Sequence, residues 1–187
     1  LDYKNLCFEV SNELKSILKK DYKVKIEFEK IKLSTFDYAK KFMGQIIFIY
    51  FIQKKGWIGI DENKSFSEKQ GQKNFLSDIF YNSKIKYNNF FDEIYEPLIF
   101  EGLNNLKEEN FFDLLKCKLP QFNISLFEPI KDYDWRKTKI TISNNIFEKI
   151  FSIFSRYNFT AIEEKGLDQD IAVDPEMLGK ILENLME

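Results

Sequence analysis

Histidine is absent from this chain of 187 residues, and cysteine is scarce. Without an imidazole, the sequence excludes serine and cysteine triads of the usual kind, imidazole general bases, and most zinc sites with mixed His and Cys ligands. The two cysteines, Cys7 and Cys117, are far apart and lie in segments that we expect to be helical. We therefore expect free thiols in a reducing cytoplasm rather than a disulfide.

Long apolar runs are also missing. The longest, residues 46–52, is much shorter than the roughly 20 residues that a membrane-spanning helix needs, and lysines flank it on both sides. The sequence shows no signal peptide and no glycine-rich phosphate loop. We expect no membrane partner and, because the chain starts at Leu1, a fragment of a longer protein.

Apolar residues make up 44% of the chain, and 20 of them are phenylalanine, so the sequence predicts a packed core rather than disorder. The net charge of -2 is unevenly distributed. Residues 1–60 hold 12 lysines and 7 acidic residues, whereas residues 61–187 hold 16 basic and 23 acidic residues. The N-terminal third is therefore the basic part of the chain.

Apolar residues at three- and four-residue spacing predict a mainly α fold, an irregular multi-helix bundle with a few short strands or a small hairpin. The central helix is predicted over 34–55, with Ser34 or Thr35 as its N-cap and Gly56 at its C-terminal end. Other helices are predicted over 3–20, 74–81, 90–106 with an interruption or kink near Pro97, 108–117, and 144–157 capped by Ser143.

The remaining segments are predicted as strands or loops. Residues 23–29 alternate polar and apolar side chains and form a short strand or a linker, and residues 138–142 alternate as a strand does. Residues 59–72 and 120–129 are loop-like or extended. We divide the chain into an N-terminal helix and basic linker (1–33), a helical core (34–157), and a junction loop and helix (158–187).

Four lysines are candidate contacts to a DNA backbone. Lys15 and Lys19 lie on the polar face of the first helix, and Lys54 and Lys55 end the central one. For the first pair we favour a solvated helix face over a phosphate contact, because no aromatic or bidentate side chain accompanies these lysines. Trp57, next to the second pair, either stacks on nucleic acid or covers the end of a buried helix.

Charged patterns typical of catalysis are weak. Glu163 and Lys165 match half of a metal-dependent nuclease site, with Asp132 or Asp134 as the missing carboxylate, and a chain with 31% charged residues contains such patterns by chance. The pair formed by Asp168 and Asp170 has the oxygen ligands that Ca²⁺ or Mg²⁺ prefers, but we favour a solvated acidic turn for this pair. We predict no catalytic, cofactor-binding or metal-binding residue in this chain.

The most patterned stretch is the C-terminal one. Asp174 and Pro175 are helix-start residues, because an aspartate caps free N–H groups and a proline needs no donor at the first helical position. Met177, Leu178 and Leu182 then begin an apolar face that requires a partner. We interpret these five residues as a structural junction.

The stretch YNFTAIEEKGLDQDIAVDPEMLGKILENL (157–185) closely resembles the segment just upstream of the methyltransferase domain in type IIG restriction-modification enzymes and related phage-defence DNA adenine methyltransferases. Three shorter stretches resemble segments of the same family in the same order: IIFIYFIQKKGWIGI (46–60), YEPLIFEGLN (95–104) and LPQFNISLFE (119–128). The chain departs from the family at 123–127, where Asn-Ile-Ser-Leu-Phe stands in place of Asn-Gly-Gly-Leu-Phe.

This resemblance implies that the chain is a non-catalytic helical connector. In the family, the S-adenosylmethionine site and the Asn/Asp-Pro-Pro-aromatic loop lie downstream of this segment, and a nuclease, when present, lies upstream. The parent enzyme would then use S-adenosylmethionine, and Mg²⁺ if a nuclease is present. The partners implied are these domains and DNA. The alternative is a self-contained helical interaction or DNA-binding protein.

Overall fold

A computed structural model describes residues 2–82, 85–104, 110–122 and 124–156. The fold is mainly α, as predicted, and a two-stranded antiparallel hairpin is the only sheet in these ranges. The elements in chain order are α1 (Asp2–Lys20), α2 (Tyr22–Lys30), α3 (Thr35–Lys54), η1 (Phe66–Glu68), α4 (Phe75–Asn82), η2 (Phe91–Tyr95), η3 (Leu98–Leu103), β1 (Phe111–Phe112), β2 (Cys117–Lys118), η4 (Ser125–Phe127), η5 (Ile130–Asp132) and α5 (Asn144–Phe154). None of the helices in the described ranges combines the length and apolar character needed to cross a membrane.

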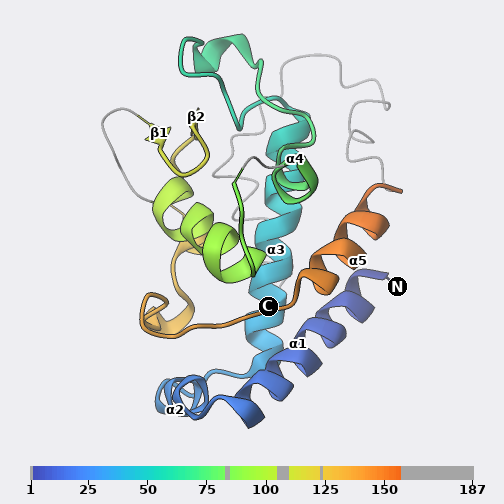
Figure 1. The fold of residues 1–187 in the computed structure, drawn as a ribbon, viewed down its shortest axis with the longest axis vertical. Helices are drawn as coiled ribbons and strands as arrows, with labels where there is room; N and C mark the ends of the chain where they lie inside the picture. Colours follow the sequence, from blue (N-terminus) through green and yellow to red (C-terminus); the bar gives the residue numbers. More distant parts are fainter. Residues whose placement is uncertain (1, 83–84, 105–109, 123, 157–187) are drawn as a thin grey trace.

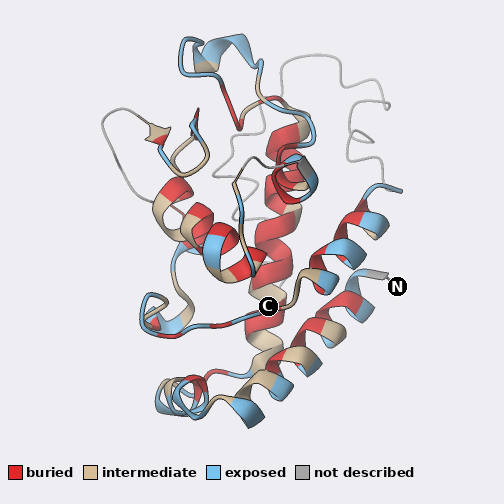
Figure 2. Ribbon diagram, in the orientation of Figure 1, coloured by how far each residue is buried: buried red, intermediate tan, exposed pale blue. Residues whose placement is uncertain are grey.

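Helix α3 lies at the centre of the fold, as its apolar sequence predicts. Buried side chains occupy most of its surface after the first turn (Figure 2), and the other elements surround it (Figure 1). The hydroxyl of Ser34 accepts the N–H of Asp37 at 3.0 Å and so caps the first turn. Because packing uses nearly all of α3, the solvent-facing surface of the protein belongs mostly to the elements around it.

The C-terminal end of α3 is a glycine turn, as predicted. Gly56 has a φ of +72°, a left-handed conformation that is unfavourable for residues with a side chain. The Gly56 N–H donates to the Gln53 carbonyl at 3.0 Å, and the Trp57 N–H donates to the Ile52 carbonyl at 3.0 Å. This turn directs the Trp57 ring onto Phe51, with the two ring centres 6.3 Å apart.

Helix α1 packs against both α3 and α5, so the N-terminal segment shares one hydrophobic core with the rest of the described chain (Figure 1). The ammonium of Lys149 lies 2.7 Å from the carboxylate of Glu9 across the α1–α5 boundary. Ser143 stands at the N-cap position of α5, but its hydroxyl donates to Glu13 at 3.1 Å instead of capping the helix. The side chain predicted as a cap therefore joins α5 to α1.

Residues 23–29 are helical, so the prediction of a strand or linker there is wrong. The Asp21 carboxylate accepts two N–H groups of the first turn of α2, at 2.9 and 3.3 Å. Val24 and Phe28 are buried one helical turn apart, while Ile26, which a strand would place on their face, is 43% exposed. The alternating sequence also contains an apolar pair at a four-residue spacing, Val24 and Phe28, and burial of this pair favours the helix over the strand.

Residues 90–103 form one helix whose turns widen to the π form over η2 and η3, on either side of Glu96 and Pro97. The Glu96 N–H bonds to the Phe91 carbonyl, five residues back. Pro97 keeps helical backbone angles, with a φ of -58° and a ψ of -39°. The irregularity predicted near Pro97 is therefore a widening of the helix and not a break.

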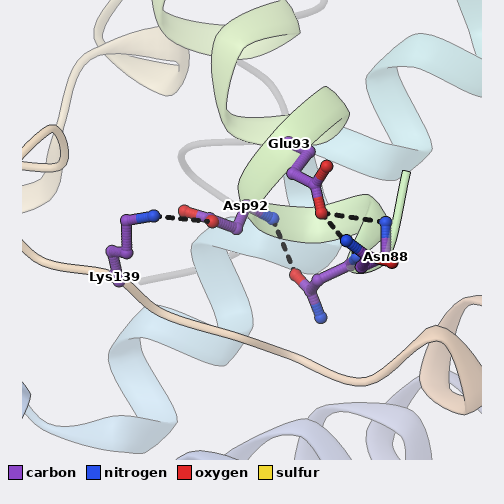
Figure 3. A network of polar contacts seen from close by, with 5 residues as sticks. Asn88, Asp92, Glu93 and Lys139 are labelled. Carbon is purple, nitrogen blue, oxygen red and sulfur yellow. Dashed lines mark hydrogen bonds and ion pairs between the residues drawn. The ribbon is translucent and has the colours of Figure 1, made fainter. Parts of the chain in front are cut away.

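A polar network fixes the start of this helix (Figure 3). One carboxylate oxygen of Glu93 accepts the N–H groups of Asn88 and Asn89 at 2.9 and 2.8 Å, and these bonds lower the pKa of Glu93. The Asn89 side chain accepts the N–H of Asp92 at 2.8 Å. The Asp92 carboxylate lies 3.6 Å from the ammonium of Lys139. The network ties the helix start to the extended segment 138–142.

Two further predictions are wrong. Residues 111–118 form a hairpin and not a helix, with Phe111 paired to Lys118 and Phe112 to Cys117, and the backbones of Ile60 and Lys118 also bridge. Residues 138–142 are extended, with alternate side chains buried, but no strand is assigned there. In the hairpin, backbone pairing within 111–118 and with Ile60 decided the structure, whereas residues 138–142 show the alternating burial of a strand without the pairing.

Aromatic rings fill the centre of the core around Phe147, which is fully buried. Its ring centre lies 4.8 Å from that of Phe90 and 5.6 Å from that of Tyr95. The other rings around it belong to Phe42, Phe80, Phe91 and Phe151. The rings around Phe147 therefore connect α3, α4, α5 and the 90–103 helix.

Candidate nucleic-acid interface

The most basic part of the described surface is the corner where α1 ends and α2 begins. Residues 15–32 contain seven lysines and three acidic residues, a net charge of +4. The Asp21 N–H bonds to the Ile17 carbonyl at 2.8 Å, and the Asp21 side chain then caps α2, so the two helices meet with one residue between them. This tight connection brings the lysines at the end of α1 close to those of α2.

We call this region the basic corner and define it as residues 15–32. It contains an open groove of about 550 Å³ between α1, α2 and the segment that follows them. Apolar residues form part of the groove, and Tyr22, at its edge, is 71% exposed. The charged residues lining it are Lys19, Lys20, Lys25, Glu29 and Lys32.

The acidic residues of the corner are already paired. The Asp21 carboxylate caps α2, while Glu29 lies 3.7 Å from Lys25 and Glu27 lies 3.6 Å from Lys30. By contrast, within the described part of the chain no carboxylate lies within ion-pair distance of the three other groove lysines: Lys19, Lys20 and Lys32. These ammonium groups face solvent and attract anions within a Debye length of about 8 Å at physiological salt.

The structure places the four predicted lysines in two groups. Lys15 and Lys19 are exposed on the basic corner, whereas Lys54 and Lys55 lie at the other end of α3, a helix about 30 Å long at 1.5 Å per residue. The ammonium of Lys54 donates to the Asn74 side chain at 3.2 Å, and that of Lys55 lies 5.9 Å from the centre of the Phe51 ring. The two pairs therefore belong to different surfaces.

The sequence also places Lys20 on the polar face of the first helix with Lys15 and Lys19, but sequence reasoning did not single out Lys25, Lys32 or Tyr22 as candidate contacts. The excess of lysine over acidic residues in the N-terminal third was the available signal. In a strand, Lys25 and Glu29 would share a face two pleats apart, whereas in α2 they are neighbours one turn apart. The groove depends on residues 23–29 being helical, because α2 forms one of its walls.

Among the candidates for chemistry in the described region, Glu96 has the most perturbed environment. Its side chain is 1% exposed, and burial, assisted by the charge of Asp92, raises its pKa. The Tyr133 hydroxyl donates to it at 2.7 Å, and the hydroxyls of Tyr133 and Tyr38 are 3.0 Å apart. The space lined by these two tyrosines and Gln45 is about 10 Å³, which holds at most one water. A substrate does not fit, so we interpret this cluster as structural.

Other potential catalytic groups are not arranged for chemistry. Burial raises the pKa of the Cys117 thiol to about 12 and also raises that of the Cys7 thiol, so both are protonated at neutral pH. Asp134 pairs with Lys137 at 2.8 Å, which lowers the pKa of Asp134. No group of three or more potential metal ligands is present in the described ranges.

Several predicted residues lie outside the described residues. These are the weak nuclease pattern of Glu163 and Lys165, the acidic pair at 168 and 170, and the whole junction: Asp174, Pro175, Met177, Leu178 and Leu182.

The fold and surface together define a mainly α domain with a basic, grooved corner and a sealed polar cluster in its core. Comparisons with protein-family models, curated proteins and solved structures gave no match to this chain.

Proposed function

We propose that this chain is a non-catalytic helical module that contacts the phosphate backbone of DNA through the basic corner. Together with the sequence resemblance, this supports a role as the connector of a cytoplasmic DNA restriction-modification enzyme, an adenine methyltransferase with or without a fused nuclease. The observation that carries the proposal is the groove lined by Lys19, Lys20 and Lys32, whose charges no carboxylate in the described residues balances. The two buried free thiols favour the reducing compartment that such an enzyme occupies.

Phosphate contacts suit this surface better than base readout does. Lysine is a flexible point charge that binds phosphate without the fixed two-bond geometry that arginine uses to read guanine. All the basic residues of the basic corner are lysines. We therefore expect binding that depends little on sequence and strongly on salt.

The test is the salt dependence of binding to a duplex DNA oligonucleotide. Lys19→Glu/Lys20→Glu removes two contacts, and at about 0.9 per phosphate the slope of log K against log salt becomes shallower by about 1.8. The control, Lys64→Glu/Lys86→Glu, makes the same change in net charge at two exposed lysines outside the corner. If the corner variant keeps the wild-type affinity and slope while circular dichroism shows a folded protein, the interface is elsewhere.

The connector role makes a second, separate prediction. The isolated chain binds no S-adenosylmethionine, because the motifs implied for the cofactor lie in the downstream domain. Isothermal titration with S-adenosylmethionine checks this, and tight binding would contradict the connector role without affecting the proposed DNA contact.

A self-contained helical DNA-binding protein is the second candidate. One observation favours it: within the described residues, α1, α3 and α5 share one hydrophobic core. The gene distinguishes the two candidates. A reading frame that continues past residue 187 into a glycine-rich cofactor motif supports the connector, and one that stops close to that point supports the self-contained protein.

A further inference from the structure

A second groove, which the proposed phosphate contacts do not use, lies near the other end of α3. Its volume is about 350 Å³, within the range of small-ligand sites. We call it the aromatic groove; the residues lining it are Trp57, Phe66, Asn110, Pro120, Gln121 and Phe122. The lining comes from the loop after α3 and from the residues on either side of the β1–β2 hairpin (Figure 1). A backbone bridge between Ile60 and Lys118 joins that loop to the hairpin.

The local fold holds the three aromatic residues of the groove in place. Trp57 follows the glycine turn of α3 and packs on Phe51. Phe66 begins η1, which Ser65 and Glu68 cap reciprocally, and it is the only partly buried residue among the exposed residues 61–70. Phe122 is buried, and its ring centre lies 5.1 Å from that of Phe48 on α3. The groove therefore has a rigid aromatic lining and an open mouth.

The chemistry of the lining fits a flat heterocycle with a polar edge. Trp57 and Phe66 are partly exposed aromatic side chains of the kind on which bases stack, and every base has a face that stacks in this way. Asn110 also lines the groove, and its amide side chain has donor and acceptor groups that complement the edge of a base.

We propose that the aromatic groove binds one unpaired nucleobase, stacked on Trp57 or Phe66. This inference rests on the proposed DNA-binding function and adds a preference for DNA that contains an unpaired base. The stacking residues are distinct from the phosphate-binding lysines of the basic corner, since the glycine turn beside Trp57 and the start of α2 lie at opposite ends of α3 (Figure 1).

The experiment compares three probes of similar charge: a duplex with one unpaired base, the same duplex with an abasic residue at that position, and the fully paired duplex. The wild-type protein prefers the unpaired base to the abasic residue by about 5- to 150-fold, the range for one base stacked on an aromatic side chain. Trp57→Leu and Phe66→Leu each reduce this preference, while Tyr81→Leu, which removes a 58% exposed aromatic of α4, leaves it unchanged. Two groove variants are used because Trp57 also packs on the core.

Fluorescence gives a direct readout. The chain has two tryptophans, so in a Trp135→Phe background the signal comes from Trp57 alone, and the unpaired base quenches it while the abasic probe does not. Equal binding of the unpaired-base and abasic probes overturns the stacking proposal and leaves the phosphate contacts standing. Failure to bind any probe overturns both proposals. Binding of a proline-rich peptide in the groove, with no base effect, assigns it to a protein partner instead.

Discussion

The buried carboxyl group of Glu96 makes the stability of this protein depend on pH in a direction opposite to that of an ordinary ion-paired carboxylate. Its side chain is 1% exposed, one oxygen accepts the Tyr133 hydroxyl at 2.7 Å, and the other has no hydrogen-bond partner among the described residues. Burial penalises the charged form, so the pKa is higher in the folded protein than in the unfolded chain, where glutamate titrates near 4.3.

The sign follows from the number of bound protons. Below about pH 4.3 both states are protonated at Glu96, and the full stability is present. As the pH rises towards the folded pKa, the unfolded chain has released a proton that the folded protein still holds. The free energy of unfolding then falls by about 1.4 kcal/mol for each pH unit between the two pKa values.

The substitution Glu96→Gln removes this titration and keeps an oxygen that accepts the Tyr133 hydroxyl. We expect wild-type stability to fall relative to the variant as the pH rises through this window. With urea m-values of about 1–3 kcal/mol/M, the difference between their unfolding midpoints changes by about 0.5–1.4 M per pH unit. Urea unfolding followed by circular dichroism at half-unit steps measures it.

Glu62→Gln is the control, because Glu62 is an exposed loop residue. Its unfolding midpoint is expected to follow that of the wild type at every pH. If the midpoints of Glu96→Gln and wild type also run in parallel from pH 4 to pH 8, Glu96 titrates equally in both states, and the account of its burial is refuted.

Two further substitutions test the packing. Gly56→Ala places a side chain at a φ of +72° and a new Cβ 2.2 Å from the Lys69 carbonyl oxygen. It therefore lowers the free energy of unfolding, measured by urea unfolding, by at least about 1–2 kcal/mol. An unchanged urea midpoint would contradict the geometry of the glycine turn. Phe147→Ala empties the centre of the aromatic core and lowers the free energy of unfolding by about 3–5 kcal/mol, while Phe147→Leu lowers it less. Equal losses of stability for the two variants would show that cavity size is not the cause.

The sequence was sufficient where a single helix carries its own signals. The apolar run of α3, the cap at Ser34 and the turn at Gly56 act within one or two helical turns, so the prediction over 34–55 agrees with the observed helix within a residue. Periodicity also located α1, α4 and α5, because an apolar face at helical spacing has few alternative structures.

The sequence was insufficient where two periods fit one segment. Residues 23–29 match a strand at a two-residue spacing and a helix through Val24 and Phe28, and the cap at Asp21 together with packing decides between them. The hairpin 111–118 was mistaken for a helix because its strands are only two residues long, and its position depends on the distant backbone of Ile60.

The candidate sites divide in the same way. Composition alone located the basic part of the chain and removed histidine chemistry, since charge and residue type need no fold. The tertiary structure decided which charges act together: it gathered Lys19, Lys20 and Lys32 around one groove and left Lys54 at the far end of α3. It also buried Glu96, whose sequence neighbours gave no sign of this, because the enclosing tyrosines come from segments 37 and 58 residues away, at Tyr133 and Tyr38.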